Sequence, residues 1–202
     1  MSAPAKLRLA GWIRWLHLYL SLVSFAALLF FSATGLTLNH PSWLGGDAPL
    51  LEEREGALPV EWLVPDDLEG GAVRRLEIVE RLRSTHALQG ALDAFEIDEE
   101  QCILSFQGPG YAADVIVERA SGTYALSISR PTWVAYMNDL HKGRHTGSHW
   151  SLLIDVSAVL GVLVSATGLL LLFCLKKRRR TGLVVIALGT AAVVAVAWLL
   201  VP

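Results

Sequence analysis

Cysteine and charged side chains are scarce in this sequence. It contains 2 cysteines in 202 residues, and only 18% of the residues are charged whereas 53% are hydrophobic. Cys102 lies in a polar stretch and Cys174 at the end of an apolar run, so we expect the two thiols to stay apart. Together these features exclude a disulfide framework, a cysteine metal site and an ordinary soluble domain.

Enzyme motifs are also missing. The chain has no nucleophile–base pair, no phosphate-binding loop and no metalloprotease helix, so nothing in it supports a hydrolase. It has no flavin or nicotinamide motif either. Any redox activity of this chain therefore requires partner proteins.

Three long apolar runs are present instead, at residues 15–38, 150–175 and 182–201. Each reaches the roughly 20 residues that a helix needs to cross about 30 Å of hydrocarbon. The first run is longer than the roughly 7–15-residue core of a signal peptide, so we expect it to be retained. The sequence predicts an α-helical transmembrane bundle with three spans, carried by residues 1–40, 150–175 and 182–202.

Basic residues predict the orientation of these spans. Lys6, Arg8 and Arg14 precede the first run, and five consecutive bases at residues 176–180 lie in the short loop 176–181. Such bases mark the cytoplasmic side of a membrane protein. We expect a bacterial inner-membrane protein with a cytoplasmic N-terminus and with its middle segment and C-terminus in the periplasm. In so short a loop the basic run indicates topology and not a nucleic-acid partner.

Residues 41–130 have mixed, turn-rich sequence, unlike the apolar runs around them. Within this segment, residues 50–68 are predicted to be a connecting stretch with at most short structure. Residues 72–87 predict one amphipathic helix. The apolar side chains with helical spacing in it are Val73, Leu76, Val79 and Leu82.

Strand signals follow this helix. Short apolar segments lie between turn sequences and predict antiparallel strands at residues 92–97, 102–106, 113–118 and 124–129. One helix on a small sheet makes an extracytoplasmic α+β domain. Residues 131–149 then predict an interfacial helix with apolar spacing from Trp133 to Leu140, followed by a histidine-rich approach to the second span.

Four histidines are predicted near the outer membrane face. His40 ends the first run, and His141, His145 and His149 precede the second. An ionisable group at membrane depth indicates function, because its desolvation is unfavourable. The latter three share one side of the chain if the segment is helical. Alternatively, the glycines between them break the helix and the histidines line a solvated loop, which is the favoured interpretation for His145 and His149.

Haem iron accepts neutral imidazoles from opposite sides. His40 and His141 meet this requirement in depth and are the predicted axial ligands of a b-type haem. Arg144 offers a guanidinium fork suited to a propionate. The predicted cofactor-binding residues are His40, His141, Arg144, His17, His145 and His149. Two histidines on apolar helices are equally compatible with a copper or zinc site, or with no site.

His17 lies at the other end of the first run. It precedes His40 by 23 residues (40 − 17), which is about 34 Å along a helix, so we place it near the cytoplasmic face. No second histidine is predicted there. Two copies of His17 meet in a homodimer, or the residue forms a hydrogen bond at the interface. A repeated sequence, Ser-Ala-Thr-Gly-Leu, occurs at residues 32–36 and 165–169, and close helix packing explains it without a cofactor.

These segments resemble a known family. Leu16-His17-Leu18-Tyr19, the two Ser-Ala-Thr-Gly segments, and Leu140-His141-Lys142-Gly143-Arg144 resemble the short PepSY-associated transmembrane proteins. The resemblance implies that the extracytoplasmic domain is a PepSY module. It also implies electron transfer at or across the membrane, since larger members include haem-bearing inner-membrane reductases. This chain has fewer spans than those members and lacks a cytoplasmic-side partner for His17.

Two functions from different classes follow. The leading expectation is a membrane-bound b-type-haem electron-transfer subunit that exchanges electrons with a periplasmic redox partner, either a flavoprotein or a ferric-chelate reduction system. The alternative is a membrane-anchored PepSY-type binding or regulatory module for a periplasmic protein, without a cofactor. A third interpretation is metal handling by the row of His141, His145 and His149. Beyond the lipid bilayer, the expected partners include a second copy of the chain or a larger membrane complex.

Overall fold

A computed structural model describes residues 3–40, 42–45, 50–64, 73–130 and 132–201. These residues form two compact units, which we describe separately. One unit comprises Met1–Leu29 with Asp155–Pro202, and the other comprises Phe30–Ile154.

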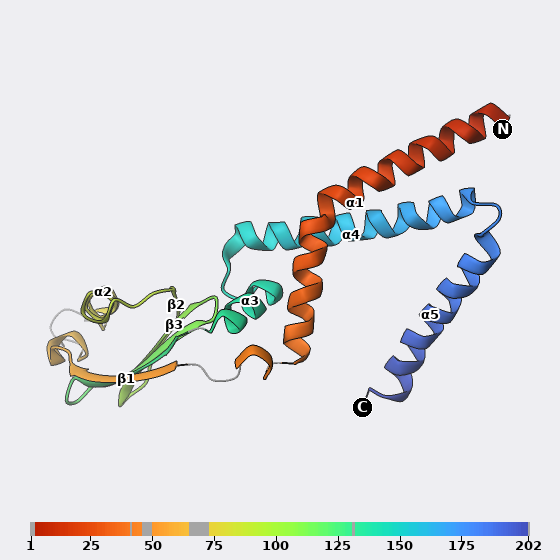
Figure 1. The fold of residues 1–202 in the computed structure, drawn as a ribbon. Helices are drawn as coiled ribbons and strands as arrows, with labels where there is room; N and C mark the ends of the chain where they lie inside the picture. The colour runs from red at the N-terminus through yellow and green to blue at the C-terminus, as the bar shows by residue number, and fades with distance from the viewer. Residues whose placement is uncertain (1–2, 41, 46–49, 65–72, 131, 202) are drawn as a thin grey trace. The chain divides into compact units, whose positions relative to one another are not determined.

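Among the described residues, three helices are long and apolar enough to cross a membrane. They are α1 (Ala3–Asn39), α4 (Gly147–Cys174) and α5 (Arg179–Leu199) (Figure 1). Their apolar side chains are largely exposed, as for Val193 at 70% and Trp198 at 86%. So large an apolar surface is typical of chains surrounded by lipid. The protein is therefore a membrane protein, whereas the orientation of its spans stays a prediction.

The second unit contains a five-stranded antiparallel sheet. Its strands are β1 (Leu50–Ala57), β2 (Ala91–Ile97), β3 (Gln101–Gly108), β4 (Tyr111–Glu118) and β5 (Thr123–Arg130). They lie in the order β1-β5-β4-β3-β2. β2 to β5 lie where the sequence predicts strands, because alternating apolar residues and tight turns mark each of them.

The prediction of a connecting stretch at residues 50–68 is wrong for its first half. Residues 50–57 form β1, which pairs with β5 from Leu50 opposite Arg130 to Ala57 opposite Thr123. β1 is an edge strand, and its half-buried positions are Glu52, Arg54 and Gly56. Because these inward positions hold polar residues and glycine, the sequence lacks the alternation of apolar and polar residues that normally marks a strand. Residues 65–68 lie outside the described residues.

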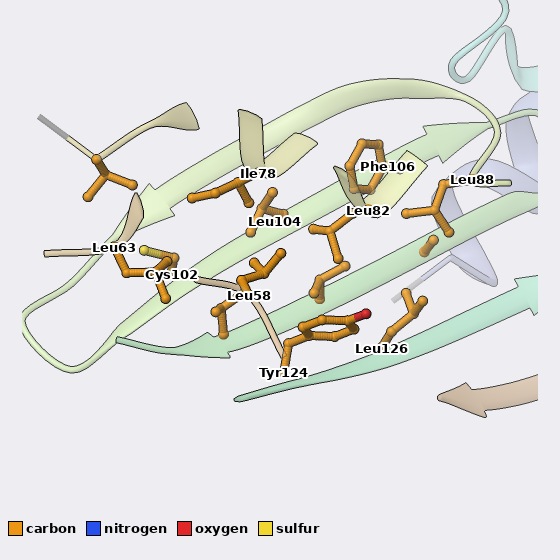
Figure 2. Packing of buried hydrophobic residues seen from close by; sticks show 14 of the residues in the cluster. Leu58, Leu63, Ile78, Leu82, Leu88, Cys102, Leu104, Phe106, Tyr124 and Leu126 are labelled. Carbon is orange, nitrogen blue, oxygen red and sulfur yellow. The ribbon is translucent and has the colours of Figure 1, made fainter. Parts of the chain in front are cut away.

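One helix, α2 (Arg75–His86), packs on the sheet. Ile78 and Leu82, one turn apart, are fully buried against the strands (Figure 2). The predicted apolar face is wrong at Leu76, which is 66% exposed. The buried Val73 lies before the first residue of α2. The predicted three-residue spacing that starts at Val73 therefore places Leu76 on the exposed face of the helix. Residue 72 lies outside the described residues.

The core between α2 and the sheet is apolar. The strands contribute inward side chains that are at most 7% exposed, namely Cys102, Leu104, Phe106, Ala113, Val115, Val117, Tyr124, Leu126 and Ile128. Burial raises the pKa of the Cys102 thiol. Cys102 is therefore a core residue.

A helical connection leads from the sheet to the second span. α3 (Trp133–Lys142) is capped at its N-terminus by Thr132, whose Oγ1 accepts a hydrogen bond from the Ala135 backbone N–H at 3.2 Å. Its C-terminal cap is Gly143, in the left-handed conformation with φ 70°. Two short 3-10 helices complete the described elements, η1 (Trp43–Gly45) and η2 (Val60–Trp62).

Candidate functional site

His141 is in the last turn of α3 and contacts α1. Its Nδ1 lies 2.6 Å from Thr34 Oγ1, and its ring meets that of Phe31 edge-on, with centroids 5.3 Å apart. A Cβ on Gly35 would lie 3.5 Å from His141 Cε1, so the glycine leaves the imidazole close to the α1 backbone. His141 is half-buried. Thr34, Gly35 and Phe31 thus contact one histidine ring. We call such a threonine–glycine pair under a histidine ring a histidine seat.

The hydroxyl of Thr34 indicates a tautomer for His141. Thr34 Oγ1 donates to the Phe30 carbonyl oxygen at 2.7 Å. With its proton on that bond, the oxygen accepts from His141 Nδ1–H, which leaves the lone pair on Nε2. Among the described residues no hydrogen bond to Nε2 is found. His141 thus presents a nitrogen able to ligate a metal or accept a proton.

His17 has the same arrangement within the other unit. Its Nδ1 lies 3.0 Å from Thr167 Oγ1, and that hydroxyl donates to the Leu163 carbonyl oxygen at 2.7 Å. A Cβ on Gly168 would lie 3.3 Å from His17 Cε1. The same hydroxyl geometry favours a proton on Nδ1 and a lone pair on Nε2 of His17. The predicted hydrogen bond of His17 exists, and its partner is a threonine of α4.

The repeated Ser-Ala-Thr-Gly-Leu sequence explains this likeness. In both copies the threonine accepts from a histidine of another segment and the next residue is the glycine beneath the ring. The prediction that packing alone accounts for the repeat is therefore incomplete. The identical five-residue sequence in two spans was the signal that could have revealed both seats.

Neighbouring contacts hold α3 in place around His141. Thr37 Oγ1 donates to Asn138 Oδ1 at 2.8 Å, and Trp150 Nε1 donates to the Leu140 carbonyl oxygen at 2.7 Å. On the sheet side, the Gly110 backbone N–H donates to Asp139 Oδ2 at 2.7 Å. Each of the three residues that precede His141 is thus held by a separate hydrogen bond.

His40 is placed differently from His141. It follows α1 directly and stacks on Trp43, with ring centroids 4.0 Å apart and an interplanar angle of 7°. The Asn39 side-chain amide lies 3.5 Å from its Nε2. Within the described part of the chain, no hydrogen bond or ring contact joins His40 to His141. Their pairing as axial ligands stays a prediction.

The three histidines from 141 to 149 do not form one helical row. α3 ends at Lys142 and α4 begins at Gly147, with His145 in the left-handed conformation at φ 53° between them. His145 is exposed in the turn and His149 is exposed in the first turn of α4. Over the described ranges, no three histidine, cysteine or acidic side chains converge as a metal-binding group would require.

His86 makes contacts that the sequence did not reveal. Its Nε2 lies 2.7 Å from Tyr124 Oη, and Arg54 Nη1 lies 3.5 Å from its Nδ1. Burial and the neighbouring Arg54 guanidinium lower the pKa of His86 below its usual 6.5. The side chain thus joins α2 to β1 and β5.

The architecture defines a class of protein: a membrane chain with three apolar helices and a helix-on-sheet domain between the first and second of them. A family model described as PepSY_TM-like matches residues 11–202. The chain belongs to this PepSY_TM-like family, which confirms the resemblance found in its sequence. No curated protein and no solved structure matches the chain.

Proposed function

We propose that this protein is a membrane-bound electron-transfer subunit that holds b-type haem and exchanges electrons with a periplasmic redox partner. One observation carries the proposal: Nδ1 of His141 and Nδ1 of His17 each lie within hydrogen-bonding distance of a threonine hydroxyl, and Nε2 of each is without a partner in the described part of the chain. Proteins orient metal-ligating histidines by this kind of hydrogen bond to the second nitrogen.

The residues present fit a haem ligand set. Neutral imidazole is the axial ligand of low-spin b-type haem, and the contact of Nδ1 with Thr34 leaves Nε2 of His141 for the iron. Phe31 supplies an aromatic edge beside the ring, and Gly35 leaves room next to it. His40 remains the candidate second ligand at this site. A bound haem would supply one-electron redox chemistry.

The threonines position the imidazoles in this proposal. Thr34 keeps the Nδ1 proton of His141 bound, so the lone pair stays on Nε2 and the ring does not rotate. Thr167 does the same for His17. Because the chain has no nucleotide motif, the electron donor or acceptor must be a second protein, either a flavoprotein or a component of ferric-chelate reduction.

The visible spectrum of the purified full-length protein tests this function. We expect a reduced, low-spin b-type spectrum in the wild type, made under haem-replete conditions, and its loss in His141→Ala. His40→Ala tests the second ligand, and His17→Ala tests whether the other seat holds a separate haem. A colourless wild type would overturn the proposal.

Threonine variants provide the matched control. Thr34→Ser keeps the hydroxyl and we expect it to retain the haem spectrum, whereas Thr34→Val removes the acceptor and frees the imidazole. Loss of the hydrogen bond to a metal ligand typically weakens metal affinity roughly 10–100-fold, and haem content should fall accordingly. Equal haem content in the serine and valine variants would rule out the positioning role of Thr34.

A cofactor-free binding module is the second candidate function, and the open face of the sheet favours it. Ile103 and Ile116 pair across β3 and β4 on the face away from α2, and they are 40% and 45% exposed. Exposed acidic residues Asp114 and Glu118 lie on the same face of β4. A paired apolar patch with an acidic border is suited to contact another protein.

Photo-crosslinking in cells tests the second candidate. A photoreactive residue at Ile116 should capture one discrete protein, whereas the same residue at the exposed Ser84 of α2 should not. A colourless protein with a specific crosslink at Ile116 would favour the module, and a haem-loaded protein without one would exclude it.

A further inference from the structure

A basic hollow lies between the sheet and the turn that joins α3 to α4. It has a volume of about 320 Å³, and the residues that decide its chemistry are Tyr111, Arg130, Thr132, Asp139, Arg144 and His145. Both arginines and His145 come from chain segments that flank α3. The hollow thus collects three basic side chains against one carboxylate.

Among the described residues, the two arginines of the hollow differ in their partners. Asp139 accepts from the Gly110 backbone N–H through Oδ2 at 2.7 Å, and Arg130 pairs with Glu52 through Nη2 alone at 3.1 Å. Over the described ranges, the Arg144 side chain has no hydrogen bond or ion pair. A free guanidinium fork beside a second arginine suits an oxyanion such as phosphate or carboxylate.

The hollow also lies at the end of a membrane span. α4 begins at Gly147, directly after the loop that contains Arg144 and His145. On α3, Trp133 is 73% exposed and stacks with Tyr136, with ring centroids 6.4 Å apart. Exposed Trp and Tyr side chains beside a span are typical of the headgroup region of a bilayer. The nearest abundant oxyanions at that depth are lipid phosphates.

We propose that this hollow binds the phosphate of an anionic phospholipid headgroup, with Arg144 as its main donor and Arg130 and His145 beside it. The site goes beyond electron transfer, and it gives Arg144 a role different from contact with a haem propionate. Bound lipid would tie the turn between α3 and α4 to the membrane surface, next to the segment that carries His141.

Native mass spectrometry of the full-length protein in detergent tests the proposal. Phosphatidylglycerol and phosphatidylcholine are added in separate arms, and inorganic phosphate in a third. We expect phosphatidylglycerol to bind in preference to phosphatidylcholine. Arg144→Gln should weaken its binding by roughly tenfold or more, because a charge-assisted bond is lost. Lys142→Gln, an exposed charge change outside the hollow, should leave binding unchanged.

Three results would overturn it. Equal phosphatidylglycerol binding by the wild type and Arg144→Gln would remove the assigned donor. Equal retention of both lipids would exclude recognition of the anionic headgroup. If inorganic phosphate displaces phosphatidylglycerol completely at equal concentration, the site belongs to a free anion.

Haem content, measured on the same samples, separates this proposal from the proposed function. A lower haem content in Arg144→Gln with unchanged lipid binding would assign Arg144 to a propionate and refute the lipid site. Lipid binding that depends on Arg144 in a colourless protein would support the lipid site while the haem function failed.

Discussion

At the scale of single residues, His86 shows how a neutral imidazole joins three elements. The Arg54 guanidinium only donates, so Nδ1 of His86 accepts and its Nε2–H donates to Tyr124 Oη. A proton added at Nδ1 would create a partly desolvated positive charge next to the Arg54 guanidinium. Both effects disfavour the protonated ring and lower the pKa of His86. The contact is therefore suited to the neutral form alone.

This pKa shift predicts a pH dependence of stability. Below the unfolded pKa of 6.5, the unfolded chain binds a proton that the folded domain takes up only at lower pH. The free energy of unfolding should therefore fall as pH drops below that value and stay constant above it. We expect a lower melting temperature for the full-length protein at about pH 5.5 than at about pH 7.5, measured by near-ultraviolet circular dichroism in detergent.

Two variants separate the charge effect from the hydrogen bond. His86→Gln cannot titrate, so its melting temperature should change less with pH than that of the wild type. Tyr124→Phe keeps the imidazole and should lose about 1 kcal/mol of stability at every pH. An identical pH slope in wild type and His86→Gln would show that another group causes the dependence.

The residues of the candidate site were predictable only in part. His17 and His141 stand out in the sequence because ionisable groups are rare in apolar surroundings. Their threonine partners are 150 and 107 positions away along the chain, and no local pattern reports such contacts. Thr34 and Thr167 also satisfy their own helices, so either would be unremarkable as an isolated residue in a span.

At the scale of elements, β3 displays two different surfaces along one strand. Leu104 is fully buried beneath α2, whereas the adjacent Ile103 is 40% exposed on the opposite face. Neighbouring residues of similar size therefore contribute very differently to stability, because successive side chains of a strand point to opposite faces.

Alanine substitutions at these two neighbours should differ clearly. Leu104→Ala leaves a cavity in the core and should lower the free energy of unfolding by about 2–5 kcal/mol. Ile103→Ala, the matched control, should lower it by less than about 1 kcal/mol. Chemical unfolding of the full-length protein, followed by tryptophan fluorescence, measures both. Similar losses in the two variants would mean that the face of β3 is assigned incorrectly.

Prediction of the elements succeeded where apolar periods were complete. β2 to β5 and α3 have such periods, bounded by glycine, proline or acidic turns. β1 was missed because it is an edge strand whose half-buried positions hold Glu52, Arg54 and Gly56. Only pairing with β5 makes it a strand, and pairing between segments so distant in the sequence is a tertiary property that local propensity does not contain.

At the scale of the whole molecule, the basic loop predicts the orientation. Residues 176–180 should lie in the cytoplasm and the sheet domain in the periplasm. A Cys174→Ala background leaves only the buried Cys102. In this background, Thr123→Cys should react with a membrane-impermeant maleimide in intact cells, and Lys177→Cys should react only after the cells are lysed. The reverse pattern would invert the topology.

The pairing of β1 with β5 also sets an order of events during synthesis. The first strand of the domain lies beside the last one, with Leu50 opposite Arg130. The 8 residues of β1 therefore find their partners only as the ribosome makes residues 123 to 130. During that delay Glu52, Glu53 and Glu55 keep the unpaired segment charged, which discourages association with strands of other chains. The domain can close only when its whole sequence is available, so its completion is a late step in the biogenesis of the protein.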